Sequence, residues 1–266
     1  VDSIGNKLWD SNGNIIFENN GNQTQPQIVR ATDNIFYVTC IDDRMGAPNI
    51  FVQKIDLQGN LIWGDNGIMG NHFRSLRNFK SILDKDNNLI LVWEDFSFNL
   101  DGMIFAQKLD YNGGFLWEFN QDDLRISSSD MNIQAQSPDV IQLQTGNYMI
   151  AWQDNRSGDY DIYGQIILPN GANLLTSEGE YLDGAAGNDI MPELCLSGNN
   201  YYMIAWININ SLDSYLKVRS FYSNPVTFIQ NWPFTLDIEQ QFNGGFNNLN
   251  FISDRAGGTL SSYVSS

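Results

Sequence analysis

Apolar and polar residues alternate with a period of two along most of this chain. Short runs rich in β-branched and aromatic residues, such as NIFYVTCI (34–41), NLILVW (88–93) and NYMIAW (147–152), are separated by turns of Asn, Asp and Gly. No stretch carries a sustained 3.6-residue apolar period. Because alternation places successive side chains on opposite faces of a strand, the pattern predicts an all-β chain.

The strand pattern repeats about every 55 residues. When the segments are aligned on their turns, the residue four places after the turn is large and apolar in each copy. The turn positions are Gly5, Gly59, Gly113, Gly171 and Pro225, and the apolar positions are Trp9, Trp63, Trp117, Leu175 and Ile229. A second set of positions has a constant offset of 14 residues: Pro26, Phe79, Pro138, Pro192 and Leu249 precede Cys40, Trp93, Trp152, Trp206 and Tyr263. Two aligned sets of positions indicate a repeat architecture.

Each repeat is predicted to contain four short antiparallel strands. The first follows the Pro or its equivalent, the second ends in the Trp run, the third holds the IFVQ, IFAQ or IYGQ run, and the fourth follows the turn glycine. Four strands per repeat, with aromatic residues at fixed places, predict a β-propeller, in which the repeats are blades packed around an axis. The predicted blades are residues 26–78, 79–136, 137–190 and 191–246, and a terminal blade is formed by 247–266 together with 1–25.

The two ends of the chain predict how the ring closes. Residues 1–25 supply the outer strand and residues 247–266 the two inner strands of one blade, so the prediction is five blades with one shared by the termini. Such pairing hides the strand edges at both ends. The alternative is that residues 1–266 are a fragment of a longer array.

Charge narrows the classes of partner. The formal net charge is −17, from 31 acidic and 14 basic residues, which disfavours nucleic acid and anionic membranes. No apolar run is long enough to cross a membrane. Cys40 and Cys195 lie in apolar strands and are expected to be buried and unpaired, and His72 has no neighbouring histidine with metal-ligand spacing.

The stretch WQDNRSGDYDIYGQ (152–165), followed by an Asn-Gly turn, has the pattern W-x-D-x-R-x-G-x-x-D-I-Y-x-Q. It resembles repeats of secreted β-propeller proteins of Bacteroidota-type bacteria that use type IX secretion, and degenerate copies cover essentially the whole chain. The resemblance implies an extracellular or cell-surface location. It says little about activity.

Recurring residues are expected to be structural. Asp42, Asp95 and Asp154 recur after the second strand, and Arg44 and Arg156 follow two of them, which predicts carboxylate–guanidinium pairs. The glutamines of the third strand are expected to bind buried backbone groups or to cross between blades: Gln53, Gln107 and Gln165, with Arg219 in the fourth copy. The in-phase Trp93, Trp152 and Trp206 are expected to form the core between blades.

Two features of the hairpin loops are candidate binding sites. Asp154, Asp159 and Asp161 offer oxygen ligands for calcium, the one cofactor that the sequence suggests, although their spacing does not match an EF-hand. Tyr160 and Trp232 are out of phase with the repeat, and an exposed aromatic face there would stack on a sugar ring.

The residue directly after the Pro position is polar in every repeat. Because the first strand is innermost in a propeller, these five residues are predicted to form a ring in the axial channel. The ring is Gln27, Lys80, Asp139, Glu193 and Asn250. Asp139 and Glu193, on adjacent blades, would suit a pair of carboxylates for glycoside hydrolysis.

These observations lead first to a non-catalytic extracellular binding or structural module whose ligand is a carbohydrate or a protein. Two alternatives stay open. One is a glycoside hydrolase or lyase that uses Asp139 and Glu193 in the axial channel, and the other is an architectural part of a larger cell-surface assembly.

Overall fold

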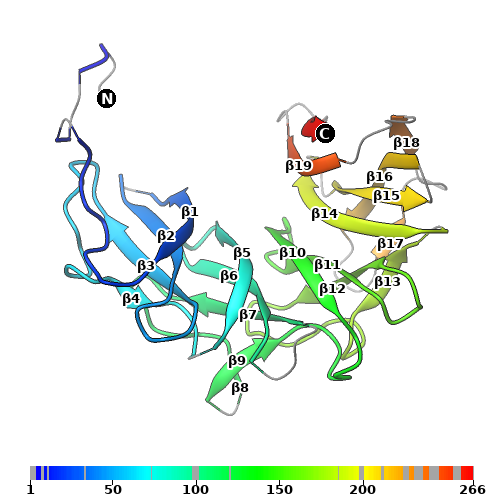
Figure 1. Cartoon of the computed structure of the whole chain (residues 1–266), viewed down its shortest axis with the longest axis horizontal. Coiled ribbons are helices and arrows are strands. Elements are labelled where there is room, and N and C mark those ends of the chain that lie inside the picture. The colour runs from blue at the N-terminus through cyan, green and yellow to red at the C-terminus, as the bar shows by residue number, and fades with distance from the viewer. Residues whose placement is uncertain are drawn as a thin grey trace.

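A computed structural model describes residues 4–6, 9–10, 12–32, 34–72, 74–97, 102–119, 121–184, 186–197, 201–210, 213–223, 228–230, 236–239, 246–253 and 259–265, with the backbone alone for Phe119 and from residue 223 onward. All of its regular elements are β-strands (Figure 1). In chain order they are β1 (Gln23–Arg30), β2 (Phe36–Asp42), β3 (Asn49–Ile55), β4 (Ile68–Met69), β5 (Leu76–Leu83), β6 (Leu89–Asp95), β7 (Met103–Leu109), β8 (Glu118–Phe119), β9 (Asp122–Arg125), β10 (Ala135–Gln142), β11 (Tyr148–Asp154), β12 (Asp161–Ile167), β13 (Glu180–Asp183), β14 (Asn188–Leu196), β15 (Tyr201–Asn210), β16 (Asp213–Ser223), β17 (Phe228–Gln230), β18 (Leu236–Glu239), β19 (Phe246–Ser253) and β20 (Thr259–Ser265).

The strands form antiparallel sheets that follow the sequence repeat. Blade 1 has the order β1-β2-β3-β4, blade 2 β5-β6-β7-β9-β8, blade 3 β10-β11-β12-β13, and blade 4 β14-β15-β16-β17, with β18 also on β16. Figure 1 shows the blades arranged along an arc, with β1, β5, β10, β14 and β19 towards its inner side. The predicted all-β propeller of four-stranded antiparallel blades is confirmed.

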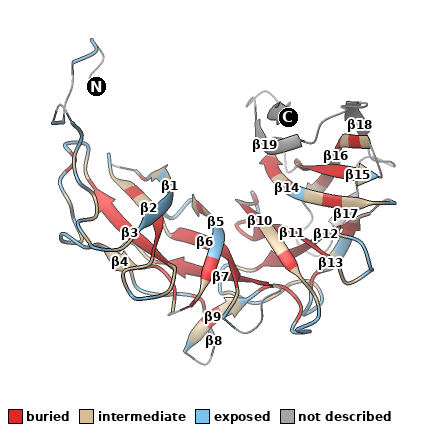
Figure 2. Ribbon diagram, in the orientation of Figure 1, coloured by how far each residue is buried: buried red, intermediate tan, exposed pale blue. Residues whose placement is uncertain are grey.

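Both faces of the middle strands are buried between blades (Figure 2). On β6, Leu89, Leu91 and Trp93 pack with blade 1, while Ile90 and Val92 pack with blade 3. Trp152 faces blade 2 and Trp206 faces blade 3 in the same way. The predicted interblade core is therefore confirmed, and its period of two follows from the alternating faces of each strand.

The outer strand lies later in the chain than expected. The segment after the turn glycine makes only an isolated bridge, at Ile55–Leu61, Leu109–Phe115 and Ile167–Asn173, and the outer strands proper are β4, β9 and β13. The third-strand glutamine fills the interruption: Gln165 Oε1 accepts from the amides of Ile166 and Leu175, and its Nε2 donates to the carbonyl of Thr176. Gln53 does the same, as predicted for this position.

Each inner strand begins before its Pro position rather than after it, and contains a β-bulge there. The register shifts between Thr24 and Gln27, Arg77 and Phe79, Gln136 and Asp139, Ile190 and Glu193, and Phe246 and Leu249. The residue before the Pro position has a positive φ in four blades, at Gln25, Asn78, Ser137 and Met191. A proline inside a strand is compatible with a bulge, so the sequence contained a signal for it.

The predicted shared blade is not joined in the part of the chain that the structure describes. β19 pairs with β20, and Figure 1 shows the N-terminal segment and β19 on opposite sides of an open gap. The indole Nε1 of Trp9 donates to the carbonyl of Leu57, and its ring lies against Gly59. Trp117 likewise donates to Pro169 and lies against Gly171. Trp9 thus occupies the place of an outer-strand tryptophan next to blade 1.

The two cysteines are buried and free, as predicted. The described residues contain no helix with the length and apolar character needed to cross a membrane.

Candidate functional site

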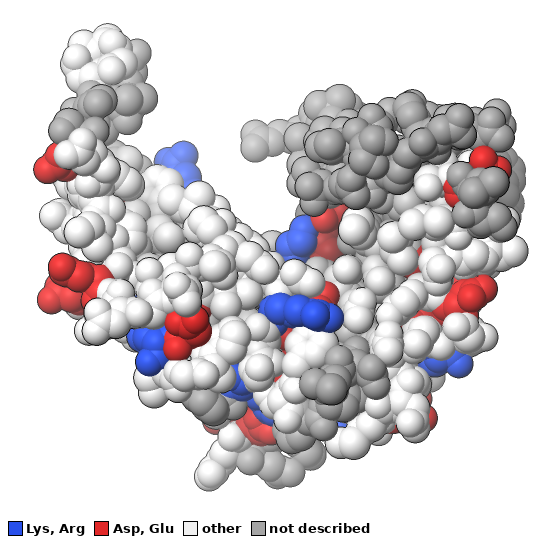
Figure 3. Space-filling model, viewed as in Figure 1, with Lys and Arg blue, Asp and Glu red and all other residues white. Residues whose placement is uncertain are grey.

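Three side chains of the predicted ring meet on the inner side of the arc. Lys80 Nζ lies 2.8 Å from Glu193 Oε1 and 3.8 Å from Asp139 Oδ1. The residues come from β5, β14 and β10, so blades 2, 3 and 4 all contribute. Figure 3 shows a hollow between the two arms of the arc, where basic and acidic side chains lie side by side near its floor. Lys80 is 37% exposed, and the side chains of Glu193 and Asp139 are 18% and 10% exposed.

The other two members of the ring do not join this cluster in the same way. Gln27 donates from Nε2 to the carbonyl of Phe79 and accepts at Oε1 from the amide and hydroxyl of Ser81. It therefore ties blade 1 to blade 2. Asn250, on β19, pairs through its backbone with Ser262 on β20, and its side chain lies outside the described residues.

Asp139 combines a structural hydrogen bond with a contact to Lys80. Its Oδ2 accepts from the amide of Leu194 at 2.6 Å, which repeats the contact of Gln27 with Ser81 two blades further on. Its Oδ1 faces Lys80. Lys80 occupies the equivalent position in blade 2, but its ammonium cannot accept a hydrogen bond and reaches across to Glu193 instead. This departure from the repeat makes the cluster a candidate functional site.

Burial shifts the protonation of these groups. Burial, and then the charge of Asp139, raise the pKa of Glu193 to about 7 against the opposing effect of Lys80. Burial also raises the pKa of Asp139. For Lys80, burial lowers the pKa, and the combined charges of Asp139 and Glu193 outweigh it and raise the pKa overall. With its pKa at about 7, the carboxyl of Glu193 exchanges a proton near neutral pH beside the ammonium of Lys80.

The spacing of the two carboxylates is compatible with acid–base chemistry. Because both carboxylates contact the same ammonium, Glu193 Oε1 and Asp139 Oδ1 are separated by at most the sum of the two distances, about 6.6 Å. Pairs of carboxylates in glycosidases are separated by roughly 5 to 9.5 Å. The predicted roles of these residues as catalytic or ligand-binding groups stay predictions.

Of the two predicted loop aromatics, Tyr160 and Trp232, the structure describes Tyr160. Tyr160 is half-buried: its hydroxyl bonds to Gln134 Oε1, its amide donates to Asn188 Oδ1, and its carbonyl accepts from the amide of Asp189. It therefore holds neighbouring loops together. Trp232 lies outside the described residues.

The three predicted calcium ligands are not brought together. The buried carboxylate of Asp154 binds the guanidinium of Arg156 and the indole of Trp152, and Asp161 accepts from the hydroxyl of Ser157. Asp159 has no role in either contact. Within the described ranges, the one group of three ligand atoms close enough for a metal is elsewhere. Calcium binding at this hairpin stays a prediction. The Asp–Arg pairs themselves are confirmed, at 2.5 Å for both Asp42–Arg44 and Asp154–Arg156.

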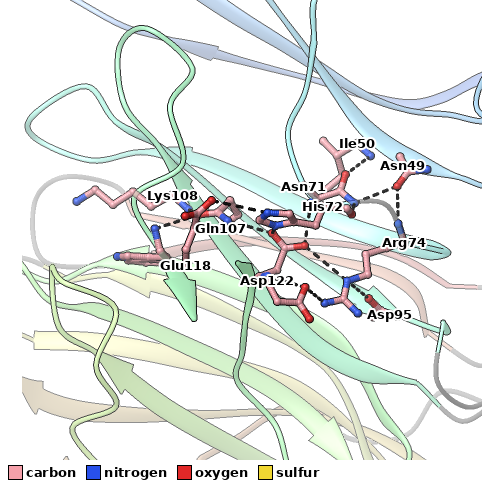
Figure 4. Close-up of polar contacts among 12 residues, drawn as sticks. Asn49, Ile50, Asn71, His72, Arg74, Asp95, Gln107, Lys108, Glu118 and Asp122 are labelled. Carbon is pink, nitrogen blue, oxygen red and sulfur yellow. Dashed lines mark hydrogen bonds and ion pairs between the residues drawn. The ribbon is translucent and has the colours of Figure 1, made fainter. Parts of the chain in front are cut away.

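That other group is an ion-pair cluster around His72 and Arg74, which sequence spacing did not reveal (Figure 4). His72 Nδ1 lies 3.0 Å from Asp123 Oδ1, and its amide donates to Asp123 Oδ2. Arg74 binds the carboxylates of Asp95, Asp122 and Asp123 and lies over the ring of Phe105. Arg74 supplies one positive charge against these three carboxylates and ties the segment before β5 to β6 and β9, so the cluster has the composition of a structural ion-pair network. Ser97 stands two residues after Asp95, where blades 1 and 3 have Arg44 and Arg156. In blade 2 Arg74 therefore supplies the guanidinium that contacts this aspartate.

Comparison with known proteins gives matches of fold. No family model matches the chain, and no curated protein matches it. Among solved structures, an ulvan lyase from a polysaccharide lyase family has a TM-score of 0.64 at 10% identity, over 92% of this chain and 62% of that one. A protein of unknown function from Dyadobacter fermentans has a TM-score of 0.60 at 9% identity, over 94% and 77%. An α-L-arabinanase from Penicillium chrysogenum, complexed with arabinobiose, has a TM-score of 0.59 at 12% identity, over 90% and 74%.

These structures correct the first functional expectation. The prediction of a non-catalytic binding or structural module is wrong on this comparison, because the similar propellers of stated activity are a polysaccharide lyase and an arabinanase. The alternative of a glycoside hydrolase or lyase stays a prediction, because these structures are 12% identical or less and are similar in fold alone. The chain spans less than two thirds of the ulvan lyase it matches.

Proposed function

We propose that this protein is a carbohydrate-active enzyme of the β-propeller class, a glycoside hydrolase whose acid–base pair is Glu193 and Asp139. The observation that carries the proposal is the cluster of Lys80, Asp139 and Glu193 on the inner strands of three blades. The fold shared with an arabinanase and a polysaccharide lyase supports it.

The residues have distinct chemical roles in this proposal. Glu193, whose pKa is raised to about 7, is the general acid that protonates the leaving glycosidic oxygen. Asp139 is the second carboxylate, and its Oδ1 acts on a water or on the anomeric carbon while Oδ2 stays bound to Leu194. Lys80 keeps one of the two carboxylates ionised while the other holds the proton.

The proposal is tested on a panel of neutral and acidic polysaccharides by the release of reducing ends. Glu193→Gln and Asp139→Asn each remove one partner, and we expect a loss of about 10² to 10⁴ in kcat, the usual contribution of a positioned acid or base. Glu178→Gln, an exposed change on the far side of blade 3, is the matched control and keeps its activity. Full activity in Glu193→Gln would exclude this assignment.

A lyase is the second candidate, because Lys80 places an ammonium that is 37% exposed beside the two carboxylates. An ammonium there would bind the carboxylate of a uronic acid next to the bond that breaks. The same panel separates the two reactions, since a lyase releases an unsaturated product and a hydrolase does not. If unsaturated products appear, the hydrolase is replaced by the lyase.

We also propose that the enzyme works outside the cell or on its surface. The repeat pattern of residues 152–165, which resembles that of propellers secreted by the type IX route, and the net charge of −17 support this location. Fractionation of the native host, with detection of the protein in the medium or on intact cells, tests it; detection only in the cytoplasm would contradict it.

A further inference from the structure

The strand that carries Glu193 is distorted directly before that residue. In β14 the register shifts between Ile190 and Glu193, and Met191 has a φ of 55°. A positive φ at a non-glycine residue is unfavourable and persists only where neighbouring groups hold it. The bulge re-aims the following side chains, so the direction of Glu193 depends on what holds Met191.

A side chain of the preceding blade holds this bulge. The amide of Met191 donates to Gln153 Oε1 at 2.7 Å. Gln153 is buried on β11, next to Trp152. Because Trp152 faces blade 2, alternation turns Gln153 towards blade 4.

Glu193 is therefore enclosed by two bonds from blade 3. Gln153 binds the amide two residues before it, and Asp139 Oδ2 binds the amide of Leu194, directly after it. Both acceptors are mostly buried, and both donors are backbone groups. This arrangement sets the position of Glu193 relative to Asp139, since Asp139 is itself one of the two anchors.

The same bond precedes Asp139. Glu94, which follows Trp93 as Gln153 follows Trp152, accepts from the amide of Ser137 at 2.6 Å, two residues before Asp139. Ser137 has a φ of 52°. The equivalent residues of blades 1 and 4 are Ile41 and Ile207, whose side chains cannot accept a hydrogen bond. An acceptor thus occurs before the two carboxylates and is missing before Lys80 and Asn250.

We propose that Gln153 and Glu94 are positioning residues, which hold the inner-strand bulges so that Glu193 and Asp139 face one another across the site. Neither residue touches the reacting atoms. The inference rests on the proposed function, since it assigns a second layer of support to the proposed acid–base pair.

Gln153 offers the sharper test, with two substitutions and a matched control. Gln153→Leu removes the hydrogen-bond acceptor. Gln153→Glu keeps an acceptor, a carboxylate like that of Glu94 in blade 2. Gln165→Leu is the control, because Gln165 is a buried glutamine of the same blade that binds backbone groups of the outer interruption. Carboxyl ¹³C titration of Glu193 and the pH profile of kcat are measured on each folded variant.

We expect Gln153→Leu to reduce kcat about tenfold or more while KM changes little, because a small misplacement of a reacting group has effects of this size. The titration of Glu193 moves towards the ordinary value of a glutamate as the residue turns to solvent. Gln153→Glu recovers much of kcat, and Gln165→Leu lowers only thermal stability. The inference would be overturned if Glu193 titrates in Gln153→Leu as it does in the wild type and the variant loses only as much stability as Gln165→Leu.

The two proposals fail in different ways. If Glu193→Gln is fully active, the proposed function is wrong, yet the titration of Glu193 in Gln153→Leu still reports whether Gln153 positions it. If Gln153→Leu does not fold, Gln153→Met and Gln153→Glu are compared by the same titration, and equal titrations in both would contradict the role of the acceptor.

Discussion

At the residue scale, equivalent positions of the repeat carry side chains with different roles. Gln27 binds only backbone and hydroxyl groups of blade 2, and Asp139 uses one oxygen in the same way. Lys80 breaks the pattern and pairs with Glu193, 113 residues further along the chain. The chemistry of the site therefore arises where one residue of a structural repeat is replaced by a cation between two carboxylates.

Glu193 predicts the pH dependence of activity. Its pKa is raised from 4.5 to about 7 by burial and by Asp139, so as a general acid it is protonated and active below that pH. We expect kcat to fall as the pH rises through about 7. The native state also binds this proton more tightly than the unfolded chain, so its contribution to stability is complete below pH 4.5 and is lost as the pH rises through about 7. A rate profile with no decline near pH 7 would contradict the assignment.

Arg156 predicts the cost of leaving a buried charge unpaired. Its guanidinium binds the fully buried carboxylate of Asp154 and also donates to the carbonyl of Glu178. We expect Arg156→Leu to lower the free energy of unfolding by about 3 kcal/mol, because Asp154 loses its cation. Urea unfolding measures the change, with exposed Arg30→Leu as the comparison. Equal stability of the two variants would show that Arg156 contributes little.

At the element scale, blades 1 to 3 have an interrupted outer strand, and the inner strands β1, β5, β10, β14 and β19 each contain a bulge. The interruption is filled by Gln53, Gln107 or Gln165, and in blade 4 Arg219 crosses instead to Asp183 and to the carbonyl of Leu182 in blade 3. Both roles expected for this position, binding backbone groups and crossing between blades, are therefore found.

The loop before the outer strand β13 contains a glycine, Gly179, that is expected not to tolerate a side chain. Gly179 has a φ of 76°, and a Cβ there would overlap the ring of Trp152 and lie 2.9 Å from the carbonyl of Gly164. We expect Gly179→Ala to destabilise the protein by about 3 kcal/mol, from backbone strain together with overpacking. Gly158→Ala, with a φ of 115° and open space around it, has the strain alone and is expected to cost about 1 kcal/mol. Calorimetry that ranks them the other way would contradict this account.

At the scale of the whole molecule, the inner strands of the blades line the inner side of the arc (Figure 1), where a hollow lies between its two arms (Figure 3). The whole chain has a net charge of −17, and in the site the ammonium of Lys80 is shared by two carboxylates. A polyanion therefore meets repulsion as it approaches the protein.

The charge predicts a preference for neutral polysaccharides. We expect kcat/KM on a neutral polymer to be nearly independent of ionic strength, and that on a polyuronate to be low and to rise as salt screens the repulsion. Rates on both polymers across a series of salt concentrations measure this. A polyuronate rate that is high at low salt and falls with added salt would reverse the conclusion and would favour the lyase.

Much of the fold could be predicted from the sequence, because the repeat is a pattern of residues that are close together in the chain. Period-two alternation and the constant offset of 14 residues determine strands, blades and the interblade tryptophans, since each depends on which face of a strand a residue occupies. The polar ring was also predictable, because Lys80, Asp139 and Glu193 share one position of the repeat. The outer strands were misplaced because a single bridge and a full strand have the same short apolar pattern.

The sequence by itself determined the fold class, the blade pattern and the candidate carboxylates, because alternation and repeat position are properties of neighbouring residues. Only the tertiary structure decided which ring members meet and what holds them. Contacts such as Lys80 with Glu193, His72 with Asp123, and Gln153 with the amide of Met191 join residues that are distant in the chain, and their existence depends on how one blade packs against the next.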